Sequence, residues 1–350
     1  MSTAATSASG SASGSAPSPS PSSSPAAASA APSGRRGPRL SGLTWLVWRQ
    51  HRAAFWTGIA VTVVGIAYFL QQRASMLALL DETGWPGPKS LELPAGFEIY
   101  NSRLADASSI LGALLPVLVG VFLGAPLIAN DLEHGTGKLV TSQTVSRGSW
   151  LARKLGIAVL MAALCTTALS AAYGWWLGPV SKLDKTLYWV AGSATGPIPV
   201  ALTLLTLVGG VAIGTVLRRT LLSMVVTFGF AVAVQLMWSE FWMSLGNPVT
   251  IRTHNGVGDG AFPELPRAAY DLDQSHLTAS GDLIGYGTCA KPTEQATQTC
   301  LDKHDVVGWS VDYLPTSALP GMLWTGAAIM LALTAGLAVF VLWWGRKRLY

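Results

Sequence analysis

The residues most able to do chemistry gather in one polar stretch, NDLEHGTGKLVTSQTVSRGSWLARK, which runs from Asn130 to Lys154. Its segment GTGKL partly matches a phosphate-binding loop, which needs the pattern G-x-x-x-x-G-K-[ST] after a strand. Leu132 stands where the first glycine belongs, and Leu139 follows the lysine. Because the pattern fails at two positions, we expect that this chain does not hydrolyse ATP by itself.

A second group of reactive side chains lies in a polar segment near the C-terminus. His254, His276 and His304 share that segment with Cys289 and Cys300. Their spacings match no zinc-binding pattern, so scattered surface histidines are the better interpretation. The chain also has no nucleophile elbow, H-E-x-x-H motif or dinucleotide fingerprint. We therefore predict no catalytic, cofactor-binding or metal site, and a protein that is not an enzyme.

The polar stretch 130–154 instead has features that shape the backbone. Gly135 permits a sharp turn, and Thr136 can cap a short helix that continues to about residue 143. That helix would present Leu139 and Val140 from its surface. Ser146 then predicts the cap of a longer helix. The stretch is thus expected to form a short helix between two long ones.

Composition places these long helices in a membrane. Half of the 350 residues are hydrophobic and only 12% are charged, against about 25% in soluble domains. The first apolar segment, 53–70, would extend about 27 Å as a helix, enough for a bilayer core of about 30 Å. We predict six spans, at about 53–70, 108–129, 155–177, 196–217, 220–242 and 321–344.

Basic residues indicate the orientation of these spans. If both termini are cytoplasmic, the predicted inner segments carry 14 basic residues and only Asp131 and Glu133 as acids. The short outer loops, 71–107 and 178–195, carry only five. The positive-inside rule therefore places the stretch 130–154 in the cytoplasm. The 14 residues are Arg35, Arg36, Arg39, Arg49, Arg52, Lys138, Arg147, Arg153, Lys154, Arg218, Arg219, Arg346, Lys347 and Arg348.

The parts outside the spans differ in composition. Residues 1–40 form a tail rich in Ser, Ala and Pro, which predicts disorder. Residues 41–52 combine Trp and Arg, so they are either an interfacial helix or an extension of the first span. The outer segment 243–320 is polar, and we expect short helices and turns there rather than an independent domain.

Residues inside the spans bear on the energy source and on packing. Glu240 is the only acidic residue, so the midplane carboxylate expected of an ion-coupled carrier is missing and energy enters from elsewhere. Pro116 should kink the second span, and Gln235 is best explained by an interhelical hydrogen bond. GxxxG motifs at 120–124 and 210–214 indicate close packing, either within the bundle or at a dimer face.

The polar stretch between the second and third spans resembles the corresponding loop of the permease subunits of type-2 ABC transporters. The resemblance rests on Glu133, Gly135-Thr136, Ser146-Arg147 and Lys154, in this order. The resemblance implies an all-α membrane protein of six transmembrane helices, with a cytoplasmic coupling helix that docks on a separate ABC ATPase. It further implies a second permease protomer, identical or different, and ATP with Mg²⁺ on the ATPase. The residues assigned to coupling are Glu133, Gly135, Thr136, Leu139, Val140 and Arg147.

The sequence thus predicts a plasma-membrane exporter permease that contacts lipids and an ATPase and binds no nucleic acid. The alternative is a membrane receptor, or an accessory or immunity protein, whose outer segment binds a ligand without any ATPase. We also predict a disulfide between Cys289 and Cys300, because both lie in the outer segment, where thiols oxidise. Cys165 lies within a span and should stay free.

Overall fold

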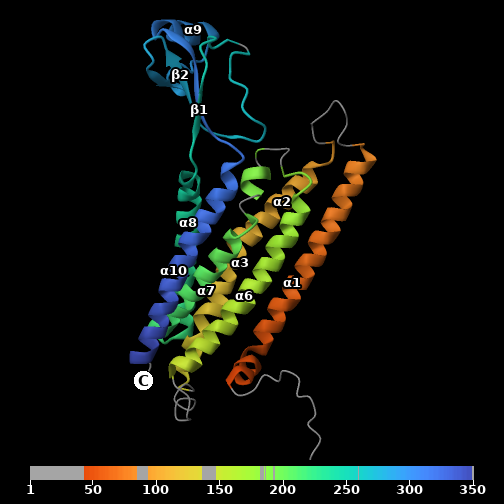
Figure 1. Ribbon diagram of the computed structural model, residues 1–350, viewed down its shortest axis with the longest axis vertical. Coiled ribbons are helices and arrows are strands. Elements are labelled where there is room, and N and C mark those ends of the chain that lie inside the picture. The colour runs from red at the N-terminus through yellow and green to blue at the C-terminus, as the bar shows by residue number, and fades with distance from the viewer. Residues whose placement is uncertain are drawn as a thin grey trace, which may run out of the picture. The chain divides into compact units, whose positions relative to one another are not determined.

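The computed structural model describes residues 43–84, 94–135, 147–181, 185, 187–191, 194–258 and 260–348. The predicted disordered tail, residues 1–40, lies outside them. The described chain is mostly helical, as predicted for a six-span membrane protein (Figure 1). One end of the helix bundle, called the loop end here, carries Glu133 and Arg147. The other, called the sheet end, carries a small sheet formed by residues 249–314.

Within the described residues, six helical segments are long and apolar enough to cross a membrane, which confirms the predicted spans. Several extend further than predicted, because a helix continues past the hydrocarbon layer. The first reaches twelve residues beyond position 70 and joins residues 43–52 to the span in one helix. The helices are α1 (Leu43–Glu82), the composite second span (Glu98–Glu133), α6 (Arg147–Leu177), α7 (Ile198–Leu217), α8 (Thr220–Phe241) and α10 (Ala318–Arg348).

The second span alternates between α-helix and the wider π-helix on both sides of Pro116. Proline has no N–H to donate to the carbonyl four residues before it, which is that of Gly112. Gln235 on α8 fills this role, since its Nε2 donates to Gly112 O at 3.0 Å. The interhelical bond predicted for Gln235 is therefore confirmed. The segments are α2 (Glu98–Ser109), η1 (Ile110–Leu114), α3 (Leu115–Leu118), η2 (Val119–Gly124) and α4 (Ala125–Glu133).

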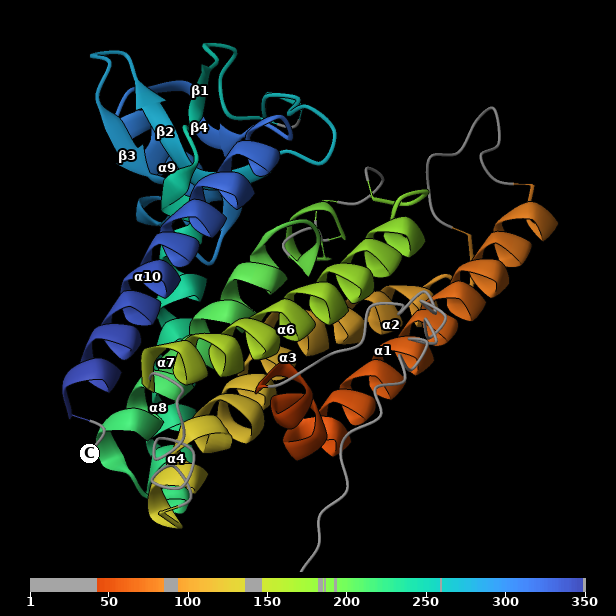
Figure 2. The ribbon, with the colours of Figure 1, turned by 60° about the horizontal axis from the view of Figure 1, so that its bottom comes forward.

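α7 is the central helix of the bundle: 78% of its most apolar stretch is buried, against 17% for α1 and α8 (Figure 2). It packs against the second span through glycines of both GxxxG motifs. A Cβ at Gly124 would lie 2.5 Å from Leu207 O, and one at Gly210 would lie 2.6 Å from Gly120 O. These motifs therefore serve packing between two helices of the same chain.

The segment between α8 and α10 forms a four-stranded antiparallel sheet, in the order β1-β4-β2-β3. The expectation of short helices and turns was wrong for most of this segment. Its pairings are long-range: Val249 pairs with Tyr313 across more than sixty residues of sequence. The elements are β1 (Val249–Arg252), β2 (Tyr270–Thr278), β3 (Leu283–Gly285), α9 (Glu294–Lys303) and β4 (Val306–Leu314).

Cys289 and Cys300 are joined in a disulfide, with their Cα atoms 5.5 Å apart, and Cys165 is free. His304 lies near the two sulfurs, within 4.8 Å, but the sulfurs are bonded to each other. His276 is buried in the sheet, 4.6 Å from Trp309 between ring centroids. Burial lowers the pKa of His276, because the charged imidazolium would lose its water.

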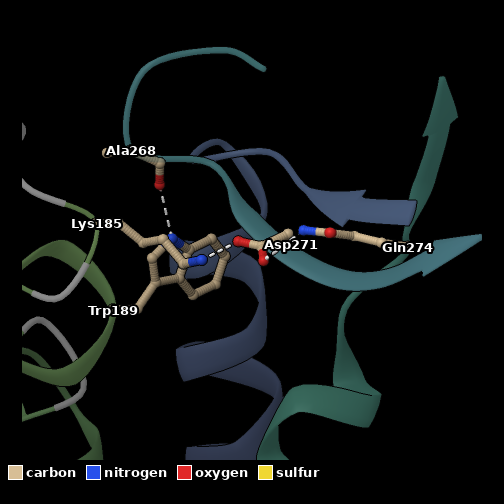
Figure 3. A network of polar contacts seen from close by, with 5 residues as sticks. All are labelled: Lys185, Trp189, Ala268, Asp271 and Gln274. Carbon is tan, nitrogen blue, oxygen red and sulfur yellow. Dashed lines mark hydrogen bonds and ion pairs between the residues drawn. The ribbon is translucent and has the colours of Figure 1, made fainter. Parts of the chain in front are cut away.

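The sheet is attached to the bundle by the segment between α6 and α7, which includes η3 (Leu187–Ala191). Trp189 is fully buried, and its Nε1 donates to Ala268 O at 2.8 Å. Lys185 forms an ion pair with Asp271 at the start of β2. Figure 3 shows both contacts side by side. The segment between α6 and α7 thus holds the start of β2, one of the two central strands of the sheet, against the bundle.

Candidate functional site

The candidate site is the loop end, where α4 ends and α6 begins. Gly135 follows α4 with a φ of +68°, a conformation that favours glycine and turns the chain away from the helix. α6 begins at Arg147, whose side chain is outside the described part. The predicted coupling residues Thr136, Leu139 and Val140 also lie outside the described residues. The structure therefore defines the two ends of the predicted coupling segment.

An ion pair joins these two ends. Lys154 Nζ on α6 donates to Asp131 Oδ2 on α4, and their side chains are 0% and 6% exposed. Lys154 also lies 5.4 Å from the ring of Trp150, one turn earlier on α6. A pair of charges so far from water holds together strongly, because either charge alone would be buried without a partner. The pair fixes the last turn of α4 to the first turns of α6.

Glu133 makes a second attachment, to α8. Its carboxylate accepts a hydrogen bond from the backbone N–H of Thr220 at 2.8 Å. Thr220 is the first residue of α8, where backbone N–H groups have no partner within the helix. Glu133 therefore caps α8 from a different helix, and its negative charge suits the positive end of the helix dipole. α4 is thus connected to α6 and to α8 within three residues.

Apolar packing surrounds the ion pair. Leu151 is fully buried and Leu155 nearly so, and both belong to a cluster with Ile128 of α4 and Val341 of α10. α10 also approaches the start of α6, because a Cβ at Gly148 would lie 2.9 Å from Arg346 Nε. The loop end is therefore closely packed, and a displacement of α4 there would also displace α6 and α10.

The structure places Glu133, Gly135 and Lys154 together at the loop end, and the coupling role that the sequence analysis gave to Glu133 and Gly135 stays a prediction. Sequence reasoning noted Lys154 in the motif, but it treated Asp131 and Lys154 as separate charges. A usable signal was present: an acid in the last turn of one span and a base near the start of the next, both among apolar residues. The contact of Glu133 with Thr220 had no sequence signal, because 87 residues separate the two positions.

The ion pair holds α4 to α6, and the helix cap holds α4 to α8, so a movement of α4 would move both neighbouring helices.

Residues 59–242 match the family described as ABC-2 membrane transporter related. This match covers more than half of the chain and includes the second to fifth spans, with Asp131, Glu133, Lys154 and Thr220 of the loop end. No curated protein and no solved structure gives a significant match.

Proposed function

Because the chain belongs to the ABC-2 membrane transporter related family, we propose that it is the permease subunit of an ABC exporter. It moves an unidentified substrate across the membrane with energy from a separate cytoplasmic ATPase subunit. ATP and Mg²⁺ bind to that partner. The described part of the chain contributes six helices long and apolar enough to span a membrane, and the sequence contains no nucleotide-binding motif.

The observation that supports this proposal most is the pair of attachments at the loop end. Asp131 holds α4 to α6 through Lys154, and Glu133 holds α4 to α8. A partner that pushes on residues 136–146 therefore moves three spans together. In this account Leu139 and Val140 enter an apolar groove of the ATPase. Glu133, Gly135, Thr136 and Arg147 set the shape and position of the segment that carries them.

The working unit contains two permease protomers, of the same or different kinds, and two ATPase subunits. Both termini and the loop end face the cytoplasm of the plasma membrane, and the sheet end faces outward. The distribution of basic residues supports this orientation, since the inner segments carry 14 of them. Lipid headgroups are the other partners of this basic face.

Isolation of the tagged chain from its native membrane tests the proposal. A protein with a Walker-A motif should be recovered with it in a stoichiometric amount, and mass spectrometry identifies it. Repeated recovery without any ATPase would instead favour the receptor, accessory or immunity protein.

Thiol labelling tests the orientation separately. In a Cys165→Ala background, Ser142→Cys should resist an impermeant reagent in intact cells, whereas Ser90→Cys should react. Cys289 and Cys300 do not interfere, because they are bonded to each other. Labelling of Ser142→Cys from outside would place the loop end on the wrong side for any cytoplasmic ATPase.

A further inference from the structure

A cavity of about 360 Å³ lies at the sheet end, where α6 ends and α7 and α10 begin. This volume is within the range of about 300–1,000 Å³ typical of small-molecule sites. Leu177 at the end of α6 and Gly178 directly after it line the cavity on one side, and Leu323 and Trp324 line it from α10. Trp324 is 67% exposed, so the cavity lies beside a surface that faces lipid. The loop end plays no part in it.

The wall of this cavity changes from apolar to polar along the bundle. Leu323 and Trp324 lie deeper in their span than Leu319, which is one turn nearer the sheet. Ser181 and Tyr188 lie beyond the end of α6 and bring hydroxyl groups to the sheet side. An amphiphile in a bilayer leaflet has the same direction of polarity, with its head outward and its chain inward.

Aromatic and basic residues near the cavity mark the level of the lipid headgroups. Trp175 follows the cavity-lining residue Gly174 and is 53% exposed. The guanidinium of Arg73 lies 4.0 Å from the centroid of the Trp175 ring and donates to the Trp175 carbonyl. Exposed tryptophan beside arginine is typical of the membrane interface. The polar part of the cavity is therefore at headgroup depth.

The sheet holds the polar wall in position. Tyr188 Oη donates to Thr316 O at 2.7 Å, and Thr316 lies between β4 and α10. The neighbouring residues Lys185 and Trp189 contact Asp271 and Ala268 of the sheet segment, as Figure 3 shows. The cavity is thus bounded by elements that are fixed relative to one another, which suits a preformed binding site.

We propose that this cavity binds a phospholipid from the leaflet at the sheet end. One acyl chain lies along Leu177, Leu323 and Trp324, and the glycerol and headgroup lie at the level of Ser181 and Tyr188, whose hydroxyls donate to Gly178 O and Thr316 O within the chain. The rest of the lipid stays in the bilayer, because the cavity is too small for a whole phospholipid. Lipid binding here is independent of the proposed ATPase, so the two proposals can fail separately.

The test uses the purified full-length chain in lipid nanodiscs, with a phosphatidylcholine that carries a photoreactive diazirine on its acyl chain. Mass spectrometry maps the labelled residues after illumination. Residues 174–181 and 319–324 should be labelled about tenfold more than the exposed residues Leu221, Leu222, Val225 and Val226 of α8, a difference of about 1.4 kcal/mol in binding. Equal labelling of both regions would mean annular lipid only and would overturn the proposal.

Two cavity-filling variants sharpen the result. A Cβ at Gly178 would make ordinary contacts of 3.4 and 3.6 Å with backbone oxygens, so Gly178→Leu has room for its first atom. It should lower labelling of the cavity about tenfold, as should Leu323→Trp. Gly229→Leu on α8 is the control, because nothing lies within 4 Å of a Cβ there. Unchanged labelling in both cavity variants would also contradict the proposal.

Discussion

Among the described residues, a lysine–aspartate ion pair lies at each end of the bundle, and the two pairs differ in their access to water. At the loop end, the side chains of Lys154 and Asp131 are 0% and 6% exposed. At the sheet end, those of Lys185 and Asp271 are 41% and 31% exposed. The residue types are the same, and both pairs connect segments far apart in the sequence.

The difference in exposure gives the two pairs different physical roles. A buried pair contributes little net stability, yet removal of one partner leaves an uncompensated charge away from water. An exposed pair is weakened by water and salt, so its loss costs little. The loop end is therefore a place where the helices keep their relative positions, as the proposed coupling to an ATPase requires. At the sheet end the exposed pair contributes little, and the buried Trp189 with its bond to Ala268 O holds the segment in place.

The largest expected effect is the loss of one partner from the buried pair. Asp131→Asn leaves Lys154 charged and unpaired, which should lower the free energy of unfolding by about 3–5 kcal/mol. Unfolding in detergent, followed by circular dichroism, measures the change. The double variant Asp131→Leu/Lys154→Met should recover most of the loss, since it removes both charges. If the double variant has no higher free energy of unfolding than Asp131→Asn, the two charges are not coupled.

Loss of the disulfide should have the next largest effect, and at the opposite end. Cys289→Ser/Cys300→Ser frees a short loop in the unfolded chain and should destabilise the sheet segment by about 3 kcal/mol. Hydrogen exchange should rise in β2 and β4 but not in α4 or α6. A thiol count supports the experiment: alkylation should label Cys165 alone before reduction and all three cysteines afterwards.

A smaller effect is expected from the packing of η2 against α7, next to the start of α4. Gly124→Ala places a Cβ 2.5 Å from Leu207 O, and such overpacking costs about 1–3 kcal/mol. Gly229→Ala is the matched control on α8, where the space is open. It should be neutral or stabilising, because alanine favours a helix by about 1 kcal/mol over glycine. Equal changes in the free energy of unfolding for the two variants would argue against close packing of Gly124 on α7.

The exposed pair should give the smallest effect. Lys185→Gln should change the free energy of unfolding by no more than about 1 kcal/mol. Half a molar salt should remove most of that difference, because the pair is open to water. The same salt should leave the effect of Asp131→Asn almost unchanged. A large, salt-independent effect of Lys185→Gln would remove the contrast between the two ends.

The sequence was most informative where local composition decides the structure. Apolar runs of about twenty residues predicted the spans. A polar side chain within a span, Gln235, predicted an interhelical hydrogen bond, and its partner is the Gly112 carbonyl that Pro116 leaves without a donor. The extra helical turns after position 70 were missed, because polar residues such as Gln72 and Arg73 end the apolar run while the helix continues. Hydropathy measures where the bilayer ends, which need not be where the helix ends.

Contacts between distant residues could not be predicted in the same way. The sheet depends on pairings such as Val249 with Tyr313, which sequence spacing does not show. The alternation of apolar and polar residues in WSVDY, 309–313, was a usable strand signal that was missed. The partner of Glu133 is a backbone N–H, which every residue except proline offers. The burial of Asp131 follows from how four helices pack, and sequence spacing alone does not show this.

The central claim is that an ATPase acts on this permease through Leu139 and Val140. The most direct test is the ATPase activity of the purified complex in proteoliposomes carrying Leu139→Asp/Val140→Asp, compared with Gln143→Asp. We expect the double variant to reach the membrane normally but to lose transport-linked ATPase activity, because two charges would enter an apolar groove. Gln143→Asp should keep that activity. Full transport-linked activity in the double variant would contradict the account.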